Sequence, residues 1–312
     1  MPTYKEIKGT NVQSFSSDPD NPIDGQIWYN TGSSVLKVKK PSLASWATGG
    51  NMTYSQFAIA GAGTQTATIA FGGSGSNVPP ATYDGTSWTD APLLNSERQG
   101  LAGAGTQTAA LAFGGEITPS TGTAVTETWN GTSWTEVNDL NRSRRNLAGA
   151  GTQTAALGFG GSFEYFTESW NGTSWTEVNN LNTARERLGG VGTQTAALAF
   201  GGVPPSPATG VTESWNGTSW TEVNDLNTAR RFIAGAGTQT AALGFGGQPP
   251  TTGKTESWDG TSWTEVNDLN NARYWMGGTG VSTLALGFAG YTPGILTEEW
   301  TASPGVETIT AS

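Results

Sequence analysis

The chain has 312 residues, 45 of them glycine, a formal net charge of −10, and neither cysteine nor histidine. The missing residue types exclude disulfides, thiolate nucleophiles, zinc fingers, imidazole bases and Ser-His-Asp triads, so we expect a protein that is not an enzyme and has no cofactor. The negative charge disfavours nucleic acid and anionic membrane surfaces as partners.

Residues 1–44 contain no repeat. The start "MPTYKEIKGTNVQSF" lacks the apolar core of a secretory signal, and no stretch approaches the roughly 18 apolar residues of a membrane span. We therefore expect synthesis in a cytosol and no membrane insertion. The segment Ser16–Asp24 carries acidic residues without the spacing of calcium ligands, so it predicts a solvated linker and no metal site.

The stretch "DNPIDGQIWYNTGSSVLKVKKPSLASW" resembles a short module that recurs in bacteriophage tail and fibre proteins, usually before a variable domain. The residues that carry the resemblance are Gly25, Trp28, Tyr29, Leu36, Val38 and Trp46. The resemblance implies that residues 1–44 form an attachment module for other virion proteins. It also implies a location in the virion, with release from the host cytoplasm by lysis.

From residue 45 onward the chain is repetitive. Segments like "GTQTATIAFGG" begin at Gly63, Gly105, Gly151, Gly192, Gly237 and Gly280, spaced 41 to 46 residues apart. Each repeat contains an apolar run, a turn, a second apolar run, a variable loop, "TESW", a turn and "WTEV", which together predict four short strands. Because a single four-stranded sheet cannot bury both faces alone, the pattern predicts an all-β fold, a β-propeller with six blades.

The repeat also resembles the kelch repeat. The landmarks in the third copy are the pair Gly160-Gly161, the aromatic Trp170 that ends strand three, Trp175 that opens strand four, and Arg185 before the next strand one. The resemblance covers residues 45–300 and implies a kelch-like β-propeller. The copper chemistry of a galactose-oxidase-like propeller cannot carry over, because that site uses histidine and cysteine.

The spacing of one tryptophan predicts how the ring closes. Trp46 lies 17 residues before Gly63, as Trp263 lies 17 before Gly280, while the last copy, Thr297–Trp300, is not followed by a second Trp. We therefore predict a propeller over 45–312 in which Ser45–Thr48 is strand four of the last blade.

The alternative prediction has seven blades. In that interpretation Val306–Thr308 completes blade six. The seventh blade then begins with Gln26–Tyr29, Val35–Val38 and Ser45–Thr48.

Comparison between the copies predicts structural roles for several residues. Trp170 and Trp175 flank a four-residue turn, so they should face each other across a hairpin. Five copies carry Arg before strand one and Glu in "TE", whereas the first copy has Tyr54 and Ala81, which predicts that Arg and Glu form a structural ion pair. The "NGT" segments match a glycosylation acceptor, but Asp84 fills the same slot in the first copy, so we interpret these as turn residues.

Variation between the copies is confined to one face. The "TQ" and "NGTS" turns should lie together on a uniform face, and the loops joining strands two to three and four to one on the opposite, variable face. The two residues after the Arg position should encircle the channel mouth. In repeat order they read Ser55-Gln56, Gln99-Gly100, Arg145-Asn146, Glu186-Arg187, Arg231-Phe232 and Tyr274-Trp275.

Aromatic and charged residues of the variable face are the candidate binding residues, since these types anchor recognition. They are Glu164, Tyr165, Phe166, Arg187, Arg231, Trp275 and Tyr291. The hypothesis is a virion fibre protein that recognises a glycan or protein of the host surface. The alternatives are a bacterial carbohydrate-binding or protein-scaffolding propeller, and neutral drift of surface loops.

Overall fold

The structure is a computed structural model, and it describes residues 12–19, 26–39, 44–75, 77–117, 121–291, 293–302 and 306–308. These residues form strands, turns and loops, with no helix among them. The chain divides into two compact units, Met1–Ala44 with Ala302–Ser312, and Ser45–Thr301. The all-β prediction is therefore confirmed for the described part of the chain.

The first unit contains one four-stranded sheet. Its strands, in sheet order, are β1 (Gln13–Phe15), β2 (Ile27–Asn30), β3 (Val35–Lys39) and β30 (Val306–Thr308). Because β30 pairs with β3, the predicted domain of 45–312 is wrong for this strand. The alternative in which Val306–Thr308 completes the last repeat is wrong for the same reason. A three-residue strand outside the repeat carries no periodicity from which its partner could be predicted.

Asp18 organises this small sheet. Its carboxylate accepts hydrogen bonds from the Trp28 indole at 3.2 Å, the Asn30 amide at 2.7 Å and the Lys37 ammonium at 2.7 Å. The bonds from Lys37 and Asn30 hold the pKa of Asp18 below its ordinary value. Asp18 is thus bonded to the sheet although its side chain remains 38% exposed, and residues 20–24 of the predicted linker lie outside the described residues.

The second unit contains six four-stranded antiparallel sheets, one for each repeat. Sheet 1 is β5 (Ile59–Thr64), β6 (Ala67–Gly72), β7 (Ala81–Tyr83) and β8 (Trp88–Asp90); sheet 2 is β9 (Ala102–Thr106), β10 (Ala109–Phe113), β13 (Thr126–Trp129) and β14 (Trp134–Val137). Sheet 3 is β15 (Ala148–Gly151), β16 (Ala156–Phe159), β17 (Thr167–Trp170) and β18 (Trp175–Val178); sheet 4 is β19 (Gly189–Gly192), β20 (Ala197–Phe200), β21 (Thr212–Trp215) and β22 (Trp220–Val223).

Sheet 5 is β23 (Ala234–Gly237), β24 (Ala242–Phe245), β25 (Thr255–Trp258) and β26 (Trp263–Val266). Sheet 6 is β27 (Gly277–Val281), β28 (Leu284–Phe288), β29 (Thr297–Thr301) and β4 (Ser45–Thr48). In sheet 6, β4 pairs with β29 so that Trp46 lies opposite Trp300. The prediction that Ser45–Thr48 is the fourth strand of the last repeat is confirmed. A short hairpin, β11 (Glu116–Ile117) and β12 (Thr121–Gly122), lies in the variable loop of sheet 2.

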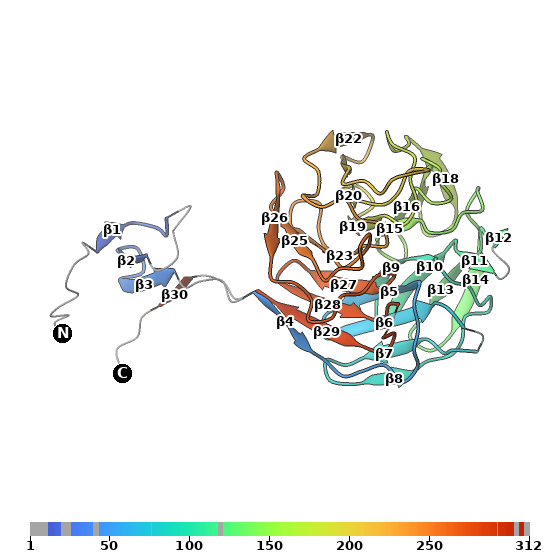
Figure 1. Ribbon diagram of the computed structural model, residues 1–312, viewed down its shortest axis with the longest axis horizontal. Coiled ribbons are helices and arrows are strands. Elements are labelled where there is room, and N and C mark those ends of the chain that lie inside the picture. Colours follow the sequence, from blue (N-terminus) through green and yellow to red (C-terminus); the bar gives the residue numbers. More distant parts are fainter. Residues whose placement is uncertain are drawn as a thin grey trace. The chain divides into compact units, whose positions relative to one another are not determined.

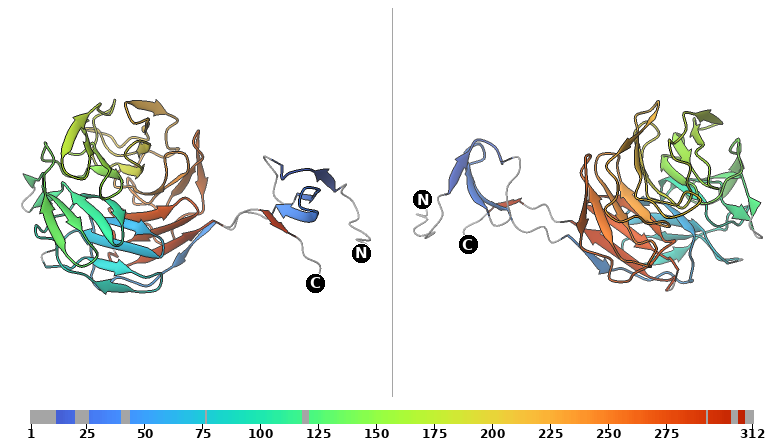
Figure 2. Two further views of the ribbon diagram at one scale, coloured as in Figure 1. Left: turned by 180° about the vertical axis from the view of Figure 1, so that it is seen from behind. Right: turned by 45° about the horizontal axis from the view of Figure 1, so that its top comes forward.

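The six sheets have a propeller-like arrangement (Figure 1), which Figure 2 shows from two further directions. The first strand of each sheet contacts the first strand of the next, in the cyclic order β5, β9, β15, β19, β23, β27 and back to β5. The second strands are largely buried, as in "ALGF" of β16, where all four residues are buried. Neighbouring sheets therefore cover each other's apolar faces, which a lone sheet could not do.

Tryptophan and phenylalanine form the core between successive sheets. Within a sheet, the predicted hairpin pair is confirmed, since the rings of Trp170 and Trp175 lie 5.4 Å apart. Trp175 also packs against Phe113 of sheet 2, with ring centroids 4.8 Å apart. The same contact joins every sheet to the next. The remaining pairs are Phe71–Trp134, Phe159–Trp220, Phe200–Trp263, Phe245–Trp46 and Phe288–Trp88.

Polar contacts repeat across the same boundaries. The indole of Trp175 donates to the Thr126 hydroxyl of sheet 2 at 3.1 Å. The Trp134 indole lacks a partner among the described residues, because Pro80 occupies the threonine slot in sheet 1. On the uniform face, the Gln153 amide donates to the Trp129 carbonyl of sheet 2 at 2.6 Å. These residues therefore stabilise the packing of neighbouring sheets.

The predicted Arg–Glu ion pairs are present in five sheets. The Nη atoms of the arginines lie 2.6 to 3.1 Å from the carboxylates, and the side chains are at most 1% exposed. The pairs are Arg98–Glu127, Arg144–Glu168, Arg185–Glu213, Arg230–Glu256 and Arg273–Glu298. Burial lowers the pKa of Arg185 to about 10, and the charge of Glu213 opposes this effect.

In the first repeat the predicted register is wrong by two residues. The ion-pair arginines lie seven residues before the glycine of the first turn, and the residue seven before Gly63 is Gln56, not Tyr54. Gln56 is 1% exposed, whereas Tyr54 is exposed. The two positions that follow the arginine slot are accordingly Phe57 and Ala58.

Candidate binding site at the variable face

The two predicted faces are confirmed by contacts between loops. On the uniform face, Gly172 of an "NGTS" turn approaches Thr154 of the "TQT" turn in the same sheet. On the variable face, the loop before the first strand bridges to the loop after the second. These bridges are Gln99–Glu116, Glu186–Val203, Arg231–Gln248 and Tyr274–Tyr291, with equivalent backbone bonds at Ser74–Phe57 and Ser162–Arg145. We call these six residue pairs the outer ring.

Six residues, one from each sheet, surround the centre of the variable face. They are Ala58, Gly100, Asn146, Arg187, Phe232 and Trp275, with φ between 54° and 61°. We call them the inner ring. The N–H of each donates to the carbonyl of the preceding one at 2.7 to 3.2 Å, and the Ala58 N–H donates to the Trp275 carbonyl at 2.8 Å, so the cycle returns to its start.

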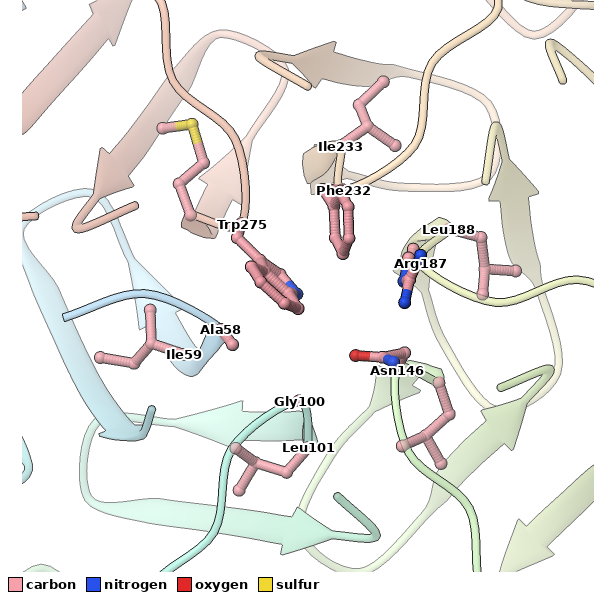
Figure 3. Close-up of a pocket in the computed structure, with 12 residues that line it drawn as sticks. Ala58, Ile59, Gly100, Leu101, Asn146, Arg187, Leu188, Phe232, Ile233 and Trp275 are labelled. Atoms are coloured by element: carbon pink, nitrogen blue, oxygen red, sulfur yellow. The ribbon is translucent and has the colours of Figure 1, made fainter. Parts of the chain in front are cut away.

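The inner ring holds side chains in an unusual backbone conformation. A positive φ costs a residue other than glycine about 1–3 kcal/mol, yet only one of the six inner-ring residues is glycine. The hydrogen-bonded cycle maintains this conformation. Figure 3 shows Asn146, Arg187, Phe232 and Trp275 arranged around a common centre. The inner ring lines a cavity of about 100 Å³, which we call the mouth cavity.

One side of the mouth is aromatic. Trp275 stacks on Phe57 with ring centroids 5.3 Å apart and contacts Phe232 at 4.3 Å. Tyr274 stacks on Tyr291 at 5.1 Å, and Tyr291 also contacts Phe57 at 5.3 Å. Burial raises the pKa of Tyr274 above its ordinary value. Sheets 5, 6 and 1 thus supply a continuous aromatic cluster.

The other side of the mouth is charged. The Arg145 guanidinium lies 2.7 Å from the Glu116 carboxylate, and Nε of Arg187 lies 2.8 Å from the Glu186 carboxylate. Burial lowers the pKa of Arg187, and the neighbouring Glu186 opposes this effect. Within the described part of the chain Arg231 forms no ion pair, and its guanidinium lies 5.6 Å from the ring centroid of Phe232. Three arginines therefore face two glutamates, in a chain whose net charge is −10.

Several buried polar atoms of the mouth lack hydrogen-bond partners among the described residues. They include Oδ1 of Asn146, Nε of Arg187, Nε of Arg231 and both carboxylate oxygens of Glu186. Asn146 is 8% exposed and Glu186 is fully buried. Since buried polar atoms are normally paired, this concentration of unpaired atoms around one cavity marks the mouth as a candidate binding site.

The structure divides the seven candidate residues into two groups. Arg187 and Trp275 line the mouth cavity, while Arg231 and Tyr291 belong to the outer ring beside it. Glu164, Tyr165 and Phe166 lie instead in the loop between β16 and β17, where Tyr165 packs against Phe166 with ring centroids 4.9 Å apart. The Arg142 guanidinium lies 3.6 Å from the Phe166 ring centroid. We call these three residues with Arg142 the side cluster.

Sequence reasoning left some residues of the mouth out of the candidate set. Asn146, Phe232 and Tyr274 were predicted to encircle the channel but were not singled out as binding residues. Phe57 was missed because of the register error in the first repeat. Counting back from Gly63, as in the other repeats, would have identified it.

Comparisons with known proteins add no relative. No protein-family model matches the chain, and no curated protein matches it either. Among the described residues there is no group of three or more acidic side chains that could hold a metal ion. The same residues contain no helix long and apolar enough to cross a membrane.

Proposed function

We propose that residues 45–301 form a closed, six-bladed, kelch-like β-propeller. The hydrogen-bonded cycle of the inner ring supports closure, because it returns to Ala58 after passing through six sheets. The Phe–Trp contacts support it independently, since Phe288 of sheet 6 packs on Trp88 of sheet 1. Gln65 of sheet 1 adds a third link, as its amide donates to the Trp300 carbonyl of sheet 6 at 2.6 Å.

This propeller is a binding module rather than an enzyme. One observation carries the proposal: residues that recur in the copies are used in packing between sheets, whereas the inner-ring positions, which differ between copies, meet at the mouth. Aromatic and arginine side chains gather there, and these types dominate binding energy at interfaces. A constant scaffold that presents a varied cluster of this kind is suited to recognition.

The setting that we propose is a bacteriophage virion. The module of residues 1–44 attaches the chain to other virion proteins, and the mouth contacts a glycan or protein of the host surface. The resemblance of the segment around Trp28 to modules of tail and fibre proteins supports this setting. Trp28 is fully buried in the first unit, and Asp18 bonds to it, so the segment forms a sheet of its own.

Mass spectrometry of purified particles tests the setting. Particles from a lysate of the producing cells are banded by density and washed in high salt, and the chain should remain at a fixed ratio to the major structural proteins. A chain found only in the soluble fraction, and equally in uninfected cells, would support a bacterial carbohydrate-binding or scaffolding propeller instead.

A further inference from the structure

We propose that the mouth cavity binds the carboxylate of an acidic sugar, such as a uronic acid at the end of a glycan. This inference rests on the proposed binding function of the mouth and specifies its ligand. It is carried by three properties of the cavity: the arginine charge at its wall, its aromatic lining and its small volume.

The cavity offers both donors and an acceptor to a ligand. All six carbonyls of the inner ring already accept a hydrogen bond from the next residue of the cycle. What remains is the Arg187 guanidinium and the Trp275 indole nitrogen as donors, together with Oδ1 of Asn146, which points toward the centre (Figure 3) and can accept a hydrogen bond from a sugar hydroxyl. Because a guanidinium pairs with both oxygens of a carboxylate at once, this set suits a carboxylate.

The charge balance supports an anion. Glu186 lies behind Arg187 and neutralises part of its charge, but neither of its oxygens accepts a hydrogen bond within the described part of the chain. Arg231 adds a further positive charge beside the cavity and has no carboxylate partner among the described residues. An incoming carboxylate therefore completes the hydrogen bonding of arginines that the protein leaves partly unpaired.

The walls and the volume suit a sugar ring. Phe232 and Trp275 line the cavity with aromatic atoms against which the C–H groups of a pyranose can pack, and the Arg187 guanidinium lies 4.7 Å from the ring centroid of Phe232. A cavity of about 100 Å³ is well below the roughly 300–1,000 Å³ of pockets that enclose whole ligands. It admits the carboxylate and the adjoining edge of one ring, while the rest of the glycan lies over Tyr291, which is 45% exposed.

Calorimetric titration of the full chain with two matched probes tests the proposal. Methyl β-glucuronide and methyl β-glucoside share one ring and differ by a carboxylate in place of a hydroxymethyl group. The glucuronide should bind at least tenfold more tightly, and raising the salt concentration should weaken only the glucuronide. Equal binding of the two, or glucuronide binding that is independent of salt, would overturn the proposal.

Variants assign the effect to the mouth. Arg187→Gln should remove the preference for glucuronide, and Trp275→Ala should weaken both glycosides by a similar factor. Lys254→Gln removes one positive charge that pairs with Glu265 outside the mouth, and it should change neither affinity. A glucuronide preference that survives Arg187→Gln would overturn the proposal. If Arg187→Gln fails to fold, the salt dependence of the unmodified chain decides.

Two outcomes separate this inference from the proposed function. A tripeptide with a free terminal carboxylate is the competing probe, and tighter binding of this peptide than of the glucuronide would replace the sugar by a protein terminus. If no probe binds but Trp275→Ala abolishes adsorption to cells, the proposed function stands and the acidic sugar is wrong. If adsorption is also unchanged, both proposals are wrong.

Discussion

Replacing Trp46 by alanine should destabilise the whole second unit, although Trp46 lies at its N-terminal edge. The side chain is 5% exposed and packs against Phe245 and Trp300, with ring centroids 4.8 and 5.5 Å away. Its indole donates to the Thr255 hydroxyl at 3.0 Å. Truncating a buried Trp to Ala costs about 3–5 kcal/mol, and the lost hydrogen bond adds about 1 kcal/mol.

The expected loss is therefore about 4–6 kcal/mol. For a unit of this size each kcal/mol lowers Tm by about 2–4 °C, so the melting transition should fall by roughly 10–20 °C. Differential scanning calorimetry measures this without relying on tryptophan fluorescence. Trp275→Ala is the matched control, because this half-buried side chain lies at the mouth, and its Tm should change by only a few degrees.

The same reasoning covers a truncation. A chain that begins at Asn51 lacks β4 altogether, so sheet 6 loses its fourth strand and the partner of Trp300. It should melt far below the full chain or fail to fold. Either a truncated chain or a Trp46→Ala variant that melts within a few degrees of the unmodified chain would refute closure through β4.

Three further predictions concern the repeated contacts. Arg185→Ala should cost about 3–5 kcal/mol in denaturant unfolding, because it leaves Glu213 buried without its partner. The double variant Arg185→Ala with Glu213→Ala should cost less than the sum of its two single variants, and additive losses would contradict the pairing. Hydrogen bonds from Thr86 and Ser87 lower the pKa of Asp84 in the folded chain to about 2. The ionised carboxylate therefore stabilises the folded state fully above the unfolded pKa of about 3.8, and this stabilisation is lost as the pH falls through about 2. The double variant Asp84→Asn with Asp259→Asn keeps a hydrogen-bond acceptor in both turns, so its Tm at pH 7 should equal that of the unmodified chain. Between pH 4 and pH 2 its Tm should fall less than that of the unmodified chain, and an equal fall would contradict this prediction. Gln65→Ala removes the hydrogen bonds to the Ala285 and Trp300 carbonyls and should lower the free energy of unfolding by about 1–3 kcal/mol, as measured by calorimetry. An unchanged Tm would contradict this prediction.

The fold was predictable because its determinants recur. Six copies of one pattern indicate the strands, and a single conserved spacing places Trp46 in the last repeat. The joint absence of Arg and Glu from the first repeat likewise indicates their contact, even though the register there was wrong. The segment before Phe57 contains no arginine, so only counting from Gly63 could have aligned it.

Other features could not be predicted from the sequence. The positive φ of Asn146, Arg187 and Trp275 follows from the hydrogen-bonded cycle, which is a property of the assembled sheets and not of these residue types. The role of Gln153 is similar: it lies on the uniform face, yet its amide bonds to the neighbouring sheet. Contacts between repeats leave no local signal in a single repeat.

In the proposed virion setting, adsorption of the labelled full chain to cells of the bacterium that produces the particles tests the central claim, that the mouth is the binding surface. Arg187→Gln with Trp275→Ala should lower adsorption at least tenfold while the variant remains folded. Val281→Ala with Leu284→Ala removes two side chains of the uniform face, each 46% exposed, and should leave adsorption unchanged. Loss of adsorption with the uniform-face pair and not with the mouth pair would contradict the account.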